Sequence, residues 1–193
     1  ARVVDLSKEK GGLKPVQLGG GKASKTIRLE NEEGQQYVLR SLNKSVEKVM
    51  VDQIKNTFAE SFFQDQISGL HPYGALVIPV LAEAAGIYHT NPELVYVPRQ
   101  PAMGIYNKSF AGSMYLFEER PDDDRSDINS FGNSKEIIGY KKLIPELQKT
   151  PKNKVDQQWV LKSRIFDQFL HDWDRHDDQW RWASFEQEDG TTL

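Results

Sequence analysis

The run from 171 to 179, His-Asp-Trp-Asp-Arg-His-Asp-Asp-Gln, is the feature that most restricts how this chain folds. It places four aspartates and two histidines within nine residues. Neighbouring carboxylates repel one another and are costly to bury, so the run must face solvent or bind a cation or a proton. The pattern predicts an amphipathic helix before it, over 157–170, and a strand after it, over 181–185. The run therefore joins a helix to a strand.

The helix before this run has a clear start and an apolar face. Asp156 is available as its N-cap. Five apolar residues recur at helical spacing and are expected to form one buried stripe. They are Leu161, Ile165, Phe166, Phe169 and Leu170.

Two interpretations of the acidic run stay open from its residues alone. It is either a solvated acidic loop, or a packed loop held by the flanking Trp173 and Trp180 that serves a function. Known metal templates do not fit. There is no His-Glu-x-x-His, and an EF-hand read from Asp172 would have Asp177 at the glycine position and Ala183 at the bidentate glutamate position. A hydrolytic or calcium site of another kind remains an alternative.

The N-terminal third is predicted to be an antiparallel sheet. Strands are expected at 15–18, 25–29 and 37–42, where β-branched, aromatic and aliphatic residues gather. The glycine-rich stretch Gly19-Gly20-Gly21-Lys22 connects the first two strands, and a turn at 31–34 connects the second and third. The expected order is strand, glycine loop, strand, turn, strand.

The rest of the chain mixes helices and strands. The capping pair Thr57 and Glu60 and the spacing of the phenylalanines that follow predict a helix over 57–69. Short apolar runs at 76–81, 94–97 and 113–117 predict further strands. Residues 121–135 are too polar to bury, and Arg125 among its acidic neighbours is expected to be solvated. The fold class is α+β.

Composition excludes several classes of protein. The balance of 25 Lys and Arg against 28 Asp and Glu argues against nucleic acid as a partner, because phosphate neutralisation needs clustered positive charge. The absence of cysteine excludes a disulfide scaffold, a thiolate zinc site and a cysteine nucleophile. No apolar run approaches the ~20 residues that span a bilayer, so membrane insertion by this segment is not expected. The chain begins without Met and stops as a return strand begins after 190, so we expect a piece of a longer protein.

The segment Asp174-Arg175-His176-x-x-Gln179 resembles the catalytic loop of atypical kinases: lipid kinases, secretory-pathway kinases, and HipA-like and spore-coat kinases. The resemblance implies that Asp174 is the catalytic base for an acceptor hydroxyl. His176 would brace the loop or the transferred phosphate, with Arg175 between them. Gln179 would occupy a magnesium-binding asparagine position, together with Asp174. Glutamine there departs from the family pattern, since its side chain is longer by one methylene.

The same resemblance assigns nucleotide contacts to the N-terminal half. Gly19, Gly20, Gly21 and Lys22 would cover the phosphates of ATP. Arg40 stands where kinases place the strand lysine that binds phosphate, and Glu60, or else Asp65, would hold it. Glu118, with Glu119, resembles the segment between lobes that presents backbone groups to adenine.

Across 17–184 the chain also resembles a segment of large cell-envelope proteins of Bacteroidetes that carry a calcineurin-like metallophosphoesterase region. The segments that show this resemblance include 37–41, 71–75 and 117–121. It implies a location in the bacterial cell envelope and neighbouring domains of a larger polypeptide as partners. The phosphoesterase's own histidine and aspartate motifs are not found here.

These features predict a two-lobed, atypical kinase-like fold, truncated in this chain. Its parts are a small-lobe-like antiparallel sheet with one helix over 1–120, an acidic loop or hinge over 121–135, and a partial, mainly helical lobe with the catalytic-like loop over 136–193. The expected function is binding of Mg-ATP and transfer of phosphate to a hydroxyl. The alternative is a non-catalytic binding or scaffold module. The departures from the kinase pattern at Arg40 and Gln179 would then be signs of lost activity.

Overall fold

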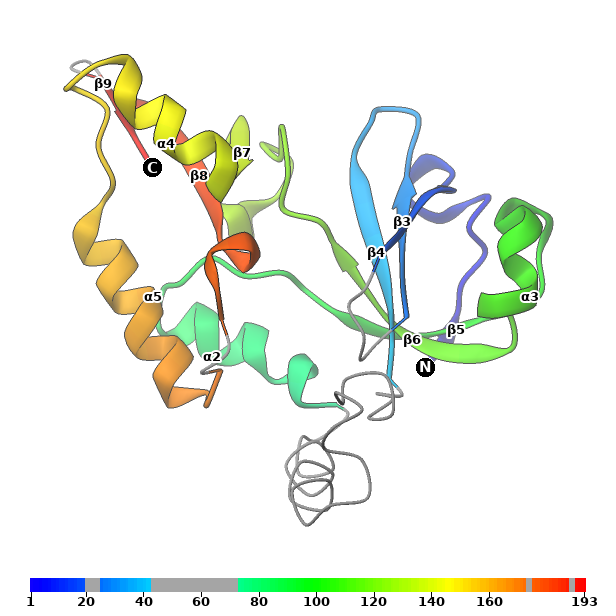
Figure 1. Ribbon diagram of the computed structural model, residues 1–193. Coiled ribbons are helices and arrows are strands. Elements are labelled where there is room, and N and C mark those ends of the chain that lie inside the picture. The colour runs from blue at the N-terminus through cyan, green and yellow to red at the C-terminus, as the bar shows by residue number, and fades with distance from the viewer. Residues whose placement is uncertain (20–24, 43–72, 173–174, 188–189) are drawn as a thin grey trace, which may run out of the picture. The chain divides into compact units, whose positions relative to one another are not determined.

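The chain is described by a computed structural model that covers residues 1–19, 25–42, 73–172, 175–187 and 190–193. These residues form a mixed α+β structure with a six-stranded and a three-stranded sheet. They divide into two compact units (Figure 1). The N-terminal unit is Ala1–Ile78 with Asn91–Arg120, and the C-terminal unit is Pro79–Thr90 with Pro121–Leu193. None of the described helices is long and apolar enough to cross a membrane.

The six-stranded sheet belongs to the N-terminal unit and has the order β1-β5-β6-β4-β3-β2. Only the β1–β5 pair is parallel. The strands predicted at 15–18, 25–29, 37–42, 94–97 and 113–117 are confirmed as β2 to β6. The bounds are β1 (Arg2–Val3), β2 (Lys14–Gly19), β3 (Thr26–Glu30), β4 (Gln36–Ser41), β5 (Glu93–Val97) and β6 (Ser113–Glu119).

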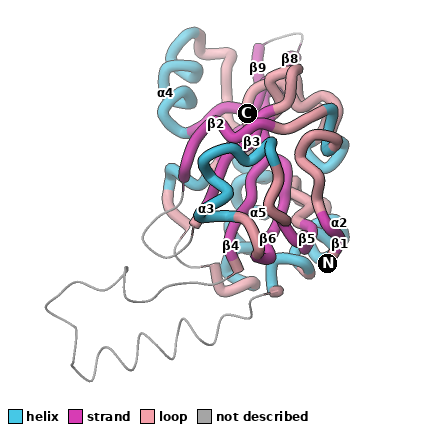
Figure 2. The backbone as a smooth tube through the Cα atoms, turned by 90° about the vertical axis from the view of Figure 1, so that its right-hand side faces the viewer, coloured by secondary structure: helices cyan, strands magenta, loops and turns pink. Residues whose placement is uncertain are grey.

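One face of this sheet carries the core of the N-terminal unit. Alternate side chains of the strands, Leu39 among them, pack there against Met103 of η4 (Pro101–Tyr106) and Phe110 of α3 (Asn107–Phe110). Figure 2 shows α3 lying over this face. The segment with η1 (Glu9–Gly11) is tied down by Gln100, whose Oε1 accepts from Leu6 N at 2.7 Å and whose Nε2 donates to Val4 O at 3.2 Å.

The C-terminal unit holds the three-stranded antiparallel sheet, in the order β7-β8-β9. The strand predicted at 181–185 and its return strand are confirmed as β8 and β9. A small core of Ile138, Leu143 and Leu193 packs beside this sheet. The bounds are β7 (Glu136–Gly139), β8 (Arg181–Gln187), β9 (Gly190–Thr192), α4 (Tyr140–Lys149), α5 (Gln157–Phe169), η5 (Asn129–Phe131) and η6 (Asp177–Gln179).

The strand predicted over 76–81 is wrong, because this stretch belongs to η3 (Gly74–Leu76) and α2 (Ile78–Ala84). A short continuous apolar run fits a strand and a helix equally well. The helix prevails because Pro79 lies in its first turn, where its missing N–H is not needed, and alanine and glutamate follow. The helix predicted over 57–69 lies outside the described residues, as do Glu60 and Asp65.

Helix α5 is confirmed, with Asp156 Oδ1 accepting from Trp159 N at 2.9 Å. Its predicted buried stripe is wrong, because Leu161, Ile165 and Phe169 are 61–69% exposed. The residue of α5 that is buried is Asp167. Helical spacing alone therefore identified the wrong face.

Arg125 was expected to be solvated and is fully buried. Its Nε binds Asp127 Oδ1 at 3.1 Å, and its guanidinium carbon lies 5.8 Å from the centre of the Phe131 ring. Its backbone N–H donates to Ser134 O at 3.0 Å, and the bridge Asp123↔Ile137 joins the segment to β7. A polar segment folds down here because an arginine and its neighbours satisfy one another.

Gly132 is required where this segment meets an aromatic cluster. Its φ is +70°, and a Cβ there would lie 2.9 Å from Phe185 Cζ and closer still to Tyr88 Oη. The Gly132→Ala variant should therefore lose about 3 kcal/mol of unfolding free energy, from left-handed strain and overpacking together. Urea denaturation measures this loss.

The matched control is Gly34→Ala, since Gly34 has a φ of +81° but open space around it. It should lose only the ~1 kcal/mol of the left-handed conformation. Equal losses in the two variants would show that the contacts with Tyr88 and Phe185 do not matter.

Candidate functional site

Arg40 and the start of the glycine-rich connection share one row across the large sheet. Gly19 pairs with Thr26, Thr26 with Arg40, and Arg40 with Leu116. Residues directly opposite one another in a sheet point to the same face. Gly19 is therefore two strands, roughly 10 Å, from Arg40. Gly20, Gly21 and Lys22 lie outside the described residues.

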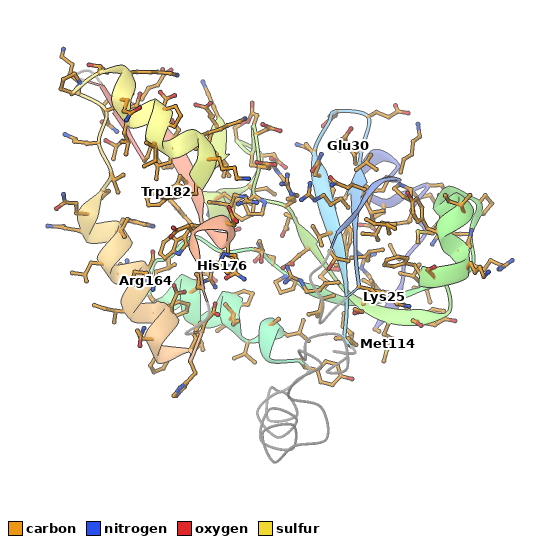
Figure 3. All side chains as sticks on the ribbon, in the orientation of Figure 1. Lys25, Glu30, Met114, Arg164, His176 and Trp182 are labelled. Atoms are coloured by element: carbon orange, nitrogen blue, oxygen red, sulfur yellow. The ribbon has the colours of Figure 1, made fainter. Side chains whose placement is uncertain are left out.

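The far end of the glycine-rich connection is fastened to β4 beside Arg40. Ser41 N donates to Lys25 O at 2.9 Å, and Lys25 N donates to Ser41 Oγ at 3.0 Å. Figure 3 labels Lys25 at this end of the sheet. The connection thus begins in the row of Arg40 and ends in the next row, at Ser41.

Arg40 lies on the face of the sheet opposite the core. Its neighbour Leu39 is buried on the core face, and successive residues of a strand alternate between faces. The Arg40 side chain is 54% exposed, and its Nη2 binds Glu118 Oε1 at 2.7 Å. A partly exposed ion pair of this kind contributes at most about 1 kcal/mol. It orients the guanidinium without burying it.

Glu118 has a side-chain partner that the resemblance did not predict. Its backbone was expected to contact adenine, whereas its side chain binds Arg40 across the β4–β6 pair. The helix carboxylates expected to hold Arg40 lie outside the described residues. Among the described residues the partner of Arg40 comes from a neighbouring strand.

The acidic run begins where α5 ends. Asp172 N donates to Asp167 O at 2.9 Å, and His171 N donates to Gln168 O at 3.1 Å. His171 has a φ of +57°, the left-handed conformation that commonly closes a helix. The chain thus turns away from the helix axis before Asp172.

Arg175, predicted to be a catalytic residue, is bound to the end of α5. Its Nε lies 3.1 Å from Asp167 Oδ1 and 2.9 Å from Asp172 Oδ2. Its carbonyl accepts from Arg164 Nη1 at 3.2 Å. The Arg164 side chain thus projects from α5 toward Arg175, and His176 is the residue after Arg175 (Figure 3). Arg175 therefore anchors the segment.

His176 and Gln179 form one turn of helix η6. Gln179 N donates to His176 O at 2.9 Å, and His176 N donates to Gln179 Oε1 at 3.3 Å. The amide oxygen expected to bind magnesium is thus used locally. Asp174 lies outside the described residues. In the part of the chain that is described, no three His, Asp or Glu side chains are grouped as a metal site would need.

Trp180, directly after the acidic run, is half-buried. Its ring stacks on Trp182, with centroids 5.9 Å apart, and Arg164 lies 5.6 Å from its centroid. Trp173 lies outside the described residues. The residues of the run before Trp180, from His176 to Gln179, are exposed.

Sequence reasoning missed Asp167, which binds this loop from within α5. Asp167 is 6% exposed, and its Oδ2 lies 3.5 Å from Arg164 Nη1. Burial raises the pKa of Asp167, with Asp172 acting in the same direction and Arg175 and Arg164 opposing it. The available signal was the i, i+3 spacing of Arg164 and Asp167, which lets the two pair on one side of α5.

Comparison with known proteins identifies no relative. No protein-family model, no curated protein and no solved structure matches the chain.

Titration of Asp167 should make the free energy of unfolding depend on pH. The Asp167→Asn variant should lack this contribution. Because the folded state raises the pKa of Asp167, ionisation of this carboxyl opposes folding as the pH rises through the acid range. The stability of the variant relative to the wild type should therefore increase with pH between about pH 3 and pH 7. Urea denaturation across this range measures the difference.

Asp124→Asn is the control of opposite sign. The backbone N–H of Ser126, 2.9 Å from Asp124 Oδ1, lowers the pKa of Asp124. Ionised Asp124 therefore stabilises the fold, and its variant should lose stability relative to the wild type as the pH rises. If the stability of both variants relative to the wild type changed with pH in the same direction, the raised pKa of Asp167 would be contradicted.

Proposed function

We propose that this chain is an atypical kinase-like domain that binds Mg-ATP and transfers phosphate to a hydroxyl. The observation that carries the proposal is the row Gly19, Thr26 and Arg40, which places an exposed arginine in line with the start of a glycine-rich connection and next to Ser41, which binds its far end. Backbone N–H groups of such a connection and a nearby cation are the groups that bind phosphates.

In the proposed site Arg40 and the stretch from Gly19 to Lys22 bind the phosphates. Arg40 suits this role because a guanidinium donates several hydrogen bonds, and Glu118 occupies one Nη of the group. Phosphate oxygens would bind the remaining donors, with Glu118 holding the side chain from the neighbouring strand. Arginine in place of the usual lysine thus gains a partner from the sheet.

The proposed chemistry belongs to the acidic run. The oxygen of the acceptor hydroxyl attacks the γ-phosphorus, the bond to the β–γ bridging oxygen breaks, ADP leaves, and the hydroxyl proton passes to the Asp174 carboxylate. Magnesium, when bound, neutralises charge on the phosphates, and we assign it to oxygens of Asp174 and Gln179, which match its preference for hard donors. His176 and Arg175 fix the loop.

A non-catalytic binding or scaffold module is the second candidate. The engagement of Gln179 Oε1 with His176 N–H favours it, because that oxygen would have to exchange a local hydrogen bond for a metal. In this reading the sheet and the exposed turn 176–179 serve as contact surfaces for neighbouring domains of a larger envelope polypeptide. Nucleotide binding separates the two candidates.

Arg40→Ala should weaken binding of Mg-ATP at least tenfold, since a charge-assisted phosphate contact is worth about 1.5–3 kcal/mol. Isothermal titration calorimetry with the intact chain measures the affinity. Arg28→Ala is the matched control: Arg28 lies on the same face, on β3, where its Nη1 donates to Gln17 Oε1 at 2.8 Å. This control should bind like the wild type.

Two results would contradict the proposal. A folded wild-type chain that does not bind Mg-ATP would leave the scaffold candidate. Equal loss in the Arg40 and Arg28 variants would show that general positive charge, rather than the row beside the glycine-rich connection, determines binding. Release of ADP in the presence of a hydroxyl acceptor then tests transfer.

A further inference from the structure

Helix α5 buries a carboxylate and exposes apolar side chains, which is the reverse of what stability alone favours. Asp167 is the buried residue of this helix, while Leu161, Ile165 and Phe169 face outward. A buried ionised group costs free energy even when it is paired. Such an arrangement is typical of a residue kept for a function other than stability.

The partners of Asp167 all belong to, or hold, the segment that carries the proposed chemistry. Oδ1 lies 3.1 Å from Arg175 Nε, and Oδ2 lies 3.5 Å from Arg164 Nη1. Arg164 Nη1 in turn donates to Arg175 O at 3.2 Å. Both the guanidinium and the backbone of Arg175 are therefore held from α5.

The anchored residue is followed directly by His176 and by the turn of η6. Within that turn Gln179 N donates to His176 O, and Trp180 N donates to Asp177 O, at 2.9 and 3.1 Å. These amides are four and five residues from Arg175. They report whether the segment keeps its conformation when the anchor is removed.

We propose that Asp167 is a positioning residue, which fixes the segment 175–179 by holding Arg175. This inference deepens the proposed function and rests on it for its catalytic meaning, because His176 lies in this segment. Arg175 accordingly acts through the loop, and its guanidinium serves as an anchor. Asp172 binds the same guanidinium through its Oδ2.

The test is native-state hydrogen exchange of the intact chain with the Asp167→Asn variant, which keeps the shape of the side chain and removes its charge. The amides of Gln179 and Trp180 should exchange about tenfold faster or more, since a charge-assisted contact of at least about 1.4 kcal/mol is lost. The midpoint of thermal unfolding should stay the same or rise. Arg175→Lys, which keeps the charge but loses the planar fork, should accelerate the same amides.

Asp156→Asn is the matched control. It removes one negative charge from the opposite end of the same helix and keeps a good N-cap. Exchange of Gln179 and Trp180 should not change in it. Unchanged exchange in both Asp167→Asn and Arg175→Lys would overturn the proposal. Faster exchange throughout the chain with a lower unfolding midpoint would also overturn it, since Asp167 would then be a general structural residue.

The proposed function is judged separately, by calorimetry and ADP release on the same samples. Asp167→Asn should bind Mg-ATP with unchanged affinity and release ADP at least tenfold more slowly. A wild type that binds no Mg-ATP would contradict the proposed function, while the exchange data would still decide whether Asp167 fixes the segment. Normal ADP release with locally faster exchange would overturn the catalytic meaning of the positioning.

Discussion

The pairing of β4 with β3 on one side and β6 on the other determines most of the N-terminal unit. This register sends Leu39 into the core and Arg40 to the opposite face. A slip by one residue would exchange the two faces and bury the guanidinium. The apolar alternation of β3, whose Ile27 and Leu29 are buried in the core, thus fixes through this pairing the row that contains Arg40 and Gly19.

The sequence predicted this sheet well because its signals are local. Alternation, β-branched residues and the turn at 31–34 specify the β3–β4 hairpin without reference to the rest of the chain. Helix α5 and its Asp156 cap are local in the same sense. The bounds of α4 were not predicted within the helical part expected over 136–193, and this helix contains Pro145.

Predictions that depended on burial were less successful. The stripe of Leu161, Ile165 and Phe169 has helical spacing, but spacing identifies a face and does not reveal what covers it. Arg125 and Asp167 show the opposite error. Charged residues are expected at the surface, and they are buried here because nearby partners satisfy them: Asp127 for Arg125, and Arg164 and Arg175 for Asp167. What covers these residues is decided by the tertiary structure.

The candidate site was therefore predictable in its residue types and less so in its contacts. Arg40, Arg175, His176 and Gln179 were singled out from the sequence, whereas Glu118 and Asp167 as their carboxylate partners were not. The resemblance to kinases directed attention to a helix carboxylate for Arg40. The sheet supplies the described carboxylate instead, from the strand beside it.

The two arginines are held in physically different ways, and the difference suits different tasks. The Arg40 side chain is 54% exposed and binds one carboxylate, so an incoming anion can compete for its remaining donors at small cost. The Arg175 side chain is 37% exposed and binds two carboxylates, those of Asp167 and Asp172, while its backbone carbonyl accepts from Arg164. An exchangeable cation is what ligand binding requires, and a fixed one is what a loop anchor requires. Because Glu118 and Asp167 are similarly buried, at 12% and 8% exposed, the number of partners rather than the burial of the carboxylate decides which arginine can exchange its contact.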